Sequence, residues 1–290
     1  MKYGLIWTNA GPFCEPERFG HLAQTAEKVG FESFWTIEHV VIPVGYKATY
    51  PYDPSGKLPM TDDFPLADPI VPLAYAAAVT STMKLATGVV ILPQRHPMYV
   101  AKEAATLDRL CNGRFMLGVG IGWLEDEFEA LNIPFAERVG RTEESIDAMR
   151  SLWREKPEPF EGQFFNWGKV ECQPKPKQVN GIPIVIGGHV NGAARRAARY
   201  GDGFFAGVFQ PEVLAPLVEV MSAECEKVGR TAKDVEVSAV LAEPDLGVVD
   251  KFREAGADRL IIFMDATQSD SDAAVEDYLS GFAENVINKS

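Results

Sequence analysis

The strongest constraint on the fold is a join that recurs along the chain, in which an amphipathic helical stretch ends in glycine and a short apolar run follows. Glycine ends helices because it adopts the left-handed backbone conformation at little cost. The join occurs at least four times, at residues 28–30, 109–113, 200–201 and 255–256. Repeated alternation of helix and strand is typical of α/β proteins.

Filling the gaps between these joins predicts eight strands, which is the number in a closed (β/α)8 barrel. The runs are continuously apolar, as expected for parallel strands buried on both faces. They span residues 3–7, 34–37, 85–91, 115–119, 184–186, 203–206, 235–240 and 259–263. The length of 290 residues suits one such barrel with modest insertions. We therefore predict a single α/β domain over residues 1–290, a (β/α)8 TIM barrel.

A doubly wound open sheet is the alternative architecture. Gly118, Gly120 and Gly122 superficially match the dinucleotide-binding fingerprint of that fold. The fingerprint belongs after the first strand of its unit, where it opens a helix directly. Here the glycines begin inside the fourth predicted strand, which favours the barrel.

Two segments interrupt the alternation of strands and helices. Residues 43–68 form a long excursion after the second strand, and residues 160–176 are predicted to form a small hairpin before the fifth. Loops that follow barrel strands lie at the catalytic, C-terminal face. The first segment is either a substrate lid or a packed surface loop, and its aromatic residues are Tyr46, Tyr50, Tyr52 and Phe64.

Composition narrows the class of partner. The net charge of −13 would repel a nucleic acid backbone, so an anionic ligand would need a locally positive pocket. No apolar run approaches the roughly 20 residues of a membrane span, and the N-terminus lacks a signal-peptide pattern, so we expect no membrane partner and a cytoplasmic protein. The four cysteines lie far apart in the sequence and indicate neither disulfides nor a zinc site.

Three of the four histidines, His39, His96 and His189, directly follow predicted strands, whereas His21 lies in a helix. Strand ends supply the active sites of barrel enzymes, so the three are candidate site residues. Together with Glu38 they could in principle bind a metal. Neither H-x-H nor H-E-x-x-H occurs, and we predict no metal.

The turn at residues 187–192 closes the fifth strand and opens a helix. Gly187 and Gly188 allow close approach of an anion, and a helix start offers unpaired N–H groups and a positive dipole end. The same turn is also explained as a tight connection with Asn191 as N-cap, and both interpretations can hold. The glycines of residues 118–122 leave room either for a flat ring system or for close barrel packing.

Several segments, in order, resemble the luciferase-like monooxygenase superfamily and particularly its F420-dependent oxidoreductase branch. They are residues 33–39, 86–89, 95–97, 112–115, 118–123, 138–142, 182–188 and 197–203. The resemblance implies that the ring of a flavin or deazaflavin lies at the C-terminal mouth of the barrel. It also implies a homodimer.

The same resemblance implies site residues. Gly88–Val89 matches a position that often carries a non-prolyl cis peptide behind the ring, and His39 matches a histidine that transfers protons in F420-dependent sugar-phosphate dehydrogenases. Trp123 stands where those dehydrogenases carry an acidic residue. The full set expected is His39 and Glu38 for catalysis, Gly88, Val89, Ile91, Gly120, Ile121, Gly122, Gly187, Gly188 and His189 for the cofactor, and Trp7, Trp123, Tyr46 and Tyr50 for the substrate.

From this we expect hydride transfer between coenzyme F420 and a small apolar molecule that is unsaturated or bears a carbonyl group. The protein would orient the reactants while the cofactor carries the hydride. One alternative is an FMN-dependent monooxygenase that consumes oxygen and receives reduced flavin from a separate reductase. Another is a non-catalytic flavin-binding protein.

Overall fold

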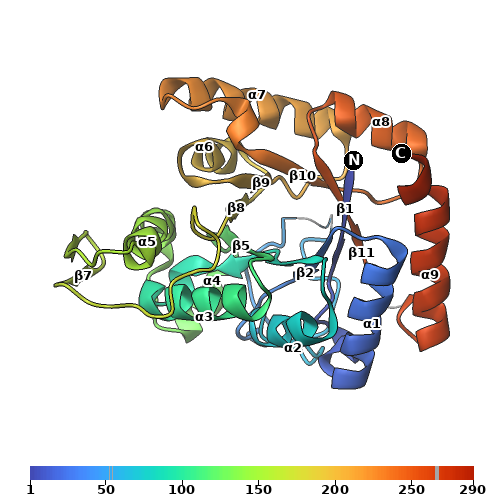
Figure 1. The fold of residues 1–290 in the computed structure, drawn as a ribbon, viewed down its shortest axis with the longest axis horizontal. Coiled ribbons are helices and arrows are strands. Elements are labelled where there is room, and N and C mark those ends of the chain that lie inside the picture. Colours follow the sequence, from blue (N-terminus) through green and yellow to red (C-terminus); the bar gives the residue numbers. More distant parts are fainter. Residues whose placement is uncertain (52, 54, 265–267) are drawn as a thin grey trace.

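Parallel strands form a closed barrel in the computed structural model, which describes residues 1–51, 53, 55–264 and 268–290 (Figure 1). The strand order is β3-β2-β1-β11-β10-β9-β8-β5-β4, and pairing of β3 with β5 closes the ring. The strands are β1 (Lys2–Ile6), β2 (Ser33–Thr36), β3 (Lys84–Thr87), β4 (Val90–Ile91), β5 (Phe115–Gly120), β8 (Ile184–Gly187), β9 (Gly203–Phe205), β10 (Glu236–Val240) and β11 (Arg259–Phe263). The closed ring confirms the (β/α)8 barrel and excludes the open sheet.

All eight strands predicted from the sequence are present, and their ends agree to within one residue. The third is divided into β3 and β4 at the Gly88–Val89 peptide bond, which is cis as the resemblance implied. Trp7 lies just beyond β1 with a φ of 68°. The repeated helix–glycine–strand join was therefore a sufficient guide to the sheet.

Helices surround the barrel (Figure 1). They are α1 (Pro16–Val29), α2 (Val71–Val79), α3 (Pro97–Leu110), α4 (Glu125–Ala130), α5 (Arg138–Trp153), α6 (Asn191–Tyr200), α7 (Pro211–Lys227), α8 (Leu246–Glu254) and α9 (Asp272–Asn285). Short 3-10 helices are η1 (Gly11–Cys14), η2 (Leu92–Gln94), η3 (Phe135–Glu137), η4 (Ala232–Asp234) and η6 (Ile287–Lys289). The expected C-cap at Gly30 is left-handed, with a φ of 101°.

The barrel interior is filled by side chains and is not a pore. The buried interior residues are Ile6, Trp35, Ala86, Met116, Val185, Phe205, Val240 and Ile261. A larger apolar layer lies between the strands and the helices. Because the interior is packed, a ligand cannot pass through the barrel.

A ring of charged residues closes the opposite, N-terminal end of the barrel. Arg259 is 1% exposed and donates through Nε to Glu32 at 2.8 Å. Lys84 lies 3.2 Å from the same carboxylate, and Glu236 also pairs with Arg259. Burial opposes ionisation of Glu32, but Arg259 and Lys84 outweigh it and hold its pKa at about 2.

Both predicted insertions are present. The hairpin pairs β6 (Phe160–Glu161) with β7 (Asn166–Trp167) in antiparallel fashion. Residues 43–68, called the lid loop below, contain no helix or extended strand in their described part, and Leu66 forms an isolated bridge with Ala10. Tyr52, one of the aromatic residues expected there, lies outside the described residues.

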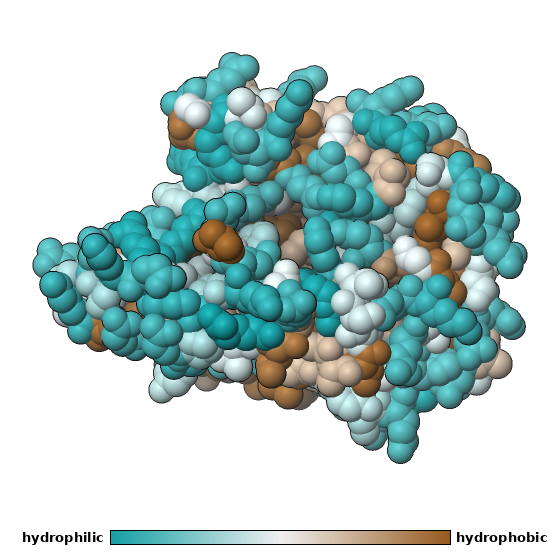
Figure 2. Space-filling model, viewed as in Figure 1, coloured by the Kyte–Doolittle hydropathy of each residue, from teal (hydrophilic) through white to brown (hydrophobic). Residues whose placement is uncertain are grey.

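The surface fits the acidic composition. Hydrophilic side chains cover most of the face shown in Figure 2. Among the described helices, none has the length and apolar character needed to cross a membrane.

Candidate active site

A cavity of about 450 Å³ opens at the C-terminal mouth of the barrel. Loops after β1, β2, β5, β8 and β9 supply its walls, and the lid loop covers part of it. The expected site residues that line it are Trp7, Glu38, His39, Tyr50, Gly88, Val89, Ile91, Gly120, Ile121, Gly122, Trp123, Gly187, Gly188 and His189. Barrel topology thus brings together residues from most of the chain.

His39 stands at one side of the cavity, immediately after β2. Its Nδ1 lies 3.0 Å from Oε2 of Glu127 on α4, and the Glu127 side chain is fully buried. The other oxygen of Glu127 accepts hydrogen bonds from the backbone N–H groups of Val40 at 2.7 Å and Val41 at 3.2 Å. Glu127 therefore holds both the imidazole and the chain that follows it.

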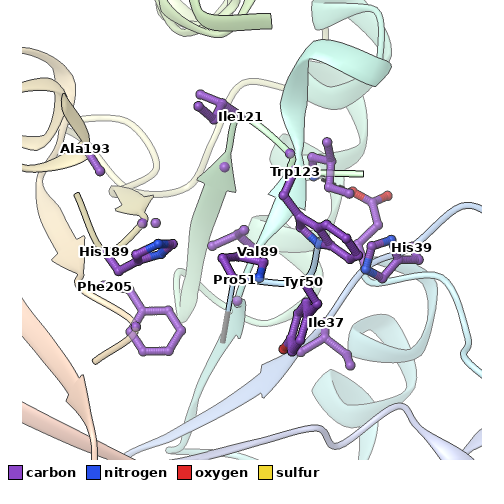
Figure 3. A pocket seen from close by; sticks show the side chains of 18 of the residues that line it. Ile37, His39, Tyr50, Pro51, Val89, Ile121, Trp123, His189, Ala193 and Phe205 are labelled. Carbon is purple, nitrogen blue, oxygen red and sulfur yellow. Dashed lines mark hydrogen bonds between the residues drawn. The ribbon is translucent and has the colours of Figure 1, made fainter. Parts of the chain in front are cut away.

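Aromatic rings surround His39. The Trp123 ring meets the imidazole edge to face, with centroids 5.7 Å apart (Figure 3). Tyr50 contacts the same indole at 5.2 Å and lines the cavity. Tyr46 also contacts Trp123, with ring centroids 5.9 Å apart, but it is buried, and its hydroxyl accepts the backbone N–H of Leu58. Tyr46 supports the wall without forming part of it in the described structure.

Val89 forms the floor between the two sides of the cavity (Figure 3). Its two methyl groups occupy the space above two glycines, because a Cβ added to Gly120 would lie 2.6 Å from Cγ2 and one added to Gly187 would lie 2.7 Å from Cγ1. Gly118 serves packing alone, since a Cβ there would meet the carbonyl oxygen of Thr87 at 1.8 Å. Of the two roles left open for these glycines, close packing is what the structure shows.

The side of the cavity opposite His39 carries His189 and the start of α6 (Figure 3). Burial lowers the pKa of His189, which favours its neutral form. The N-cap of α6 is Val190, and no described side chain caps the helix, so Asn191 is the first helical residue and not the predicted cap. The positive end of the helix is thus left available to a ligand.

Two arginines line this same side. Arg196 of α6 is 7% exposed. Its Nε lies 3.3 Å from a carboxylate oxygen of Glu143, which makes an ion pair, but the orientation is not that of a hydrogen bond. Arg138 of α5 stacks on Phe135 at 3.8 Å, and its buried Nε has no hydrogen-bond partner among the described residues. Burial lowers the pKa of Arg196, and the charge of Arg138 adds to this. Arg138 and Arg196 bring positive charge to this side of the cavity, where Glu143 pairs with Arg196.

Comparison with known proteins gives the family. The model of the luciferase-like monooxygenase family matches residues 6–243. The chain belongs to this family. A Mycobacterium tuberculosis protein, Rv0940c, is 35% identical over 211 residues, which cover 73% of this chain and 72% of that protein.

Proteins that are similar to this chain in sequence or in fold are named for different cofactors. The FMNH2-dependent dimethylsulfone monooxygenase of Pseudomonas putida is 29% identical, over 77% of this chain and 60% of its own. A solved F420-dependent secondary alcohol dehydrogenase shares the fold, with a TM-score of 0.78, 19% identity and coverage of 99% of this chain and 98% of its own. The FMN-bound oxygenating component of 3,6-diketocamphane monooxygenase from Pseudomonas putida has a TM-score of 0.76, 18% identity and coverage of 100% and 98%.

His96 departs from the expected cluster of histidines. It caps α3, where its ring accepts the N–H of Met98 at 3.2 Å and contacts Phe165. The turn η2 follows β4 and carries the chain past the mouth before His96 is reached. His96 instead borders a separate small hollow with Met98, Tyr99 and Lys102.

Glu38 lines the cavity, but its carboxylate is bound by other groups of the protein. The side chain is 1% exposed, accepts the backbone N–H of Ile91 and binds Arg95, whose Nε lies 2.9 Å away. Asp68 also binds Arg95. Burial raises the pKa of Glu38, and Arg95 opposes this. Glu38 thus joins the end of β2 to β4 and the end of the lid loop.

Three residues of the site, Glu127, Arg138 and Arg196, were not predicted from the sequence. The sequence did contain a signal for Arg196. This residue lies three positions after Ala193, so the two share one face of the helix that begins at the predicted phosphate turn. Among the described residues no group of three or more His, Cys, Asp or Glu side chains could hold a metal ion.

Proposed function

We propose that this luciferase-like protein is an F420-dependent oxidoreductase that transfers a hydride to or from a small apolar substrate bearing a carbonyl group, its alcohol, or an unsaturated bond. The observation that carries the proposal is the division of the cavity. His39, bound by Glu127, stands at one side. Two arginines and the start of α6 stand at the other, and an apolar floor lies between them.

The residues present fit a flavin or deazaflavin. Val89, Ile91 and Ile121 offer an apolar seat of the kind that suits a flat ring system. Arg138 and Arg196, with the first N–H groups of α6, would hold the phosphate of the cofactor's tail, since buried cations and a helix start together bind anions. When bound, F420 carries the hydride.

His39 would move the proton that accompanies the hydride. As a hydride leaves the carbon of an alcohol, the hydroxyl proton must go to a base, and in the reverse direction the carbonyl oxygen must receive one. A histidine at a strand end beside the cavity is suited to both steps. Glu38 would act only by positioning, because its carboxylate is bound by Arg95.

The walls near His39 favour an apolar substrate. Trp7, Tyr50, Met60 and Trp123 line the cavity. Phe263 meets Trp7 edge to face and stacks on Phe209, with the two phenylalanine centroids 5.8 Å apart. Aromatic and sulfur-containing walls bind apolar surface well and offer little to the hydroxyl groups of a sugar.

The test is a titration of the purified protein with F420 and, separately, with reduced FMN under anaerobic conditions, each read by the cofactor's own spectrum. We expect saturable binding of F420 and turnover with short-chain alcohols or ketones. His39→Ala should keep F420 affinity while kcat falls by about 100-fold or more. Tight binding of reduced FMN without affinity for F420 would refute the proposal.

A reduced-flavin monooxygenase is the second candidate, because the relative named for FMNH2-dependent oxygenation is more similar in sequence than the F420-dependent dehydrogenase. Oxygen uptake dependent on FMNH2 and substrate would establish it, and a separate reductase would then be required. A non-catalytic flavin-binding protein would show binding without turnover, and His39→Ala would change nothing. The homodimer implied by the resemblance stays a prediction.

A further inference from the structure

Glu127 is the only carboxylate that contacts the His39 ring in the described structure, and its geometry is that of an acceptor. Its Oε1 accepts two backbone N–H groups, those of Val40 and Val41. Backbone N–H groups can only donate, and two donors on one oxygen favour the ionised carboxylate. The partner of His39 is therefore a buried anion.

An ionised carboxylate beside an imidazole nitrogen fixes which nitrogen carries the proton. Nδ1 of His39 must donate to Oε2 of Glu127, because the carboxylate has no proton to give. In the neutral ring the proton is then on Nδ1, and Nε2 keeps its lone pair. Trp123, packed edge to face on the ring, limits rotation that would exchange the two nitrogens.

We propose that Glu127 is a positioning residue that holds His39 in the Nδ1–H form, so that Nε2 is the atom that exchanges protons with the substrate. This rests on the proposed function for its catalytic consequence. Nε2 accepts the hydroxyl proton as the hydride leaves the alcohol carbon, and the resulting imidazolium is stabilised by the adjacent carboxylate. In the opposite direction the imidazolium donates from Nε2 to the carbonyl oxygen.

The substitution Glu127→Gln tests the assignment directly. The amide oxygen of glutamine can still accept the N–H groups of Val40 and Val41, which leaves the amide NH2 facing His39 Nδ1. That group can only donate, so Nδ1 must become the acceptor and the ring proton must move to Nε2. The variant reverses the tautomer and keeps the shape.

The measurement is 15N NMR of the imidazole rings in the ligand-free protein, where protonated and unprotonated nitrogens resonate far apart. The chain has four histidines, and a His39→Asn spectrum assigns the signals of His39 by their loss. We expect Nδ1–H in the wild type and Nε2–H in Glu127→Gln. The matched control is Glu129→Gln, which changes an exposed carboxylate on α4 and should leave the tautomer of His39 as it is.

An Nε2–H ring in the wild type would overturn the inference, as would an unchanged tautomer in folded Glu127→Gln. If that variant does not fold, the wild-type spectrum decides alone. In the presence of F420 and substrate, Glu127→Gln should lower kcat by about 100-fold while F420 affinity stays constant, and a wild-type kcat would contradict the catalytic role. Because the NMR result needs no cofactor, failure of F420 binding would refute the proposed function and leave the tautomer assignment standing.

Discussion

Val89 fills the space that a side chain on residue 120 would need, with its Cγ2 only 2.6 Å from where a Cβ on Gly120 would stand. Gly187 receives the other methyl group of Val89 in the same way, at 2.7 Å. The two glycines therefore seat one valine, which in turn forms the floor between the His39 and His189 sides (Figure 3). The glycine-rich strand ends therefore shape the cavity through Val89.

Gly120→Ala should push Val89 into the cavity. The added methyl group cannot be accommodated without movement of the valine, and such overpacking costs about 1–3 kcal/mol. We expect affinity for the bound cofactor, F420 or reduced FMN, to fall about tenfold or more, together with a lower midpoint of thermal unfolding.

The double variant Gly120→Ala/Val89→Ala should recover much of that loss, because the smaller side chain at position 89 makes room for the new methyl group. Gly281→Ala is the control, since a Cβ there meets nothing within 4 Å in α9. Unchanged cofactor affinity in Gly120→Ala would contradict this account of the floor.

Arg196→Ala should weaken binding of a phosphate-bearing cofactor by about 10- to 100-fold, the worth of a charge-assisted hydrogen bond in a buried site. The deazaflavin fragment that lacks the phosphate should bind equally well to wild type and variant. Arg199→Ala is the matched control, because Arg199 lies on the same helix but is paired with Glu224 and does not line the cavity. An equal loss of affinity for both ligands would show that Arg196 acts on the structure and not on the phosphate.

The strands and the residues at their ends could be predicted because barrel topology carries every strand end to one face. Ile121, Gly188 and His39 needed only the assumption of a barrel to be brought together. His96 was expected among them for the same reason, but the turn η2 lies between β4 and His96, and His96 does not line the cavity. A short turn of this kind changes which face a residue reaches without altering the apolar pattern.

The charged residues on the helices were not predicted, since charge on a helix usually marks an exposed face. Arg195 and Arg196 are adjacent in the sequence, yet the first is exposed and the second buried beside the cavity. The helical spacing from Ala193 separates the two, but only once the start of the helix is known to face the cavity. Glu127 was missed for the same reason, because it follows Glu125 and Asp126 in an acidic run.

Glu32→Gln should destabilise the protein in a manner that depends on pH. The folded-state pKa of Glu32 is about 2, below the ordinary value of 4.5, so its ionised form stabilises the fold above pH 4.5 and this contribution is lost as the pH falls toward 2. We expect a free energy of unfolding lower by about 2–3 kcal/mol at pH 7, after allowance for partial exposure. Urea unfolding at pH 7 and pH 3 should show the difference narrowing.

Glu158→Gln provides the comparison for Glu32, because the Arg154–Glu158 pair is 61% exposed on both sides and should contribute under about 0.5 kcal/mol. A Glu32→Gln effect of equal size at both pH values would mean that packing, and not the charge of Glu32, stabilises the end of the barrel.

Asp126 holds the lid loop near its start, since its two carboxylate oxygens accept the backbone N–H groups of Lys47 at 3.1 Å and Ala48 at 3.2 Å. Glu127, the next residue, holds the chain after His39, so α4 fixes the loop and the histidine together. Asp126→Ala should release residues 46–51 from Trp123. We expect this change to raise KM for an apolar substrate several-fold and to speed proteolytic cleavage within the lid loop.

Glu129→Ala, which removes an exposed carboxylate on the same helix, is the control for Asp126→Ala. Equal cleavage rates in Asp126→Ala and wild type would mean that the aromatic contacts of Tyr46 and Tyr50 hold the loop without Asp126, and KM should then respond to Trp123→Ala instead.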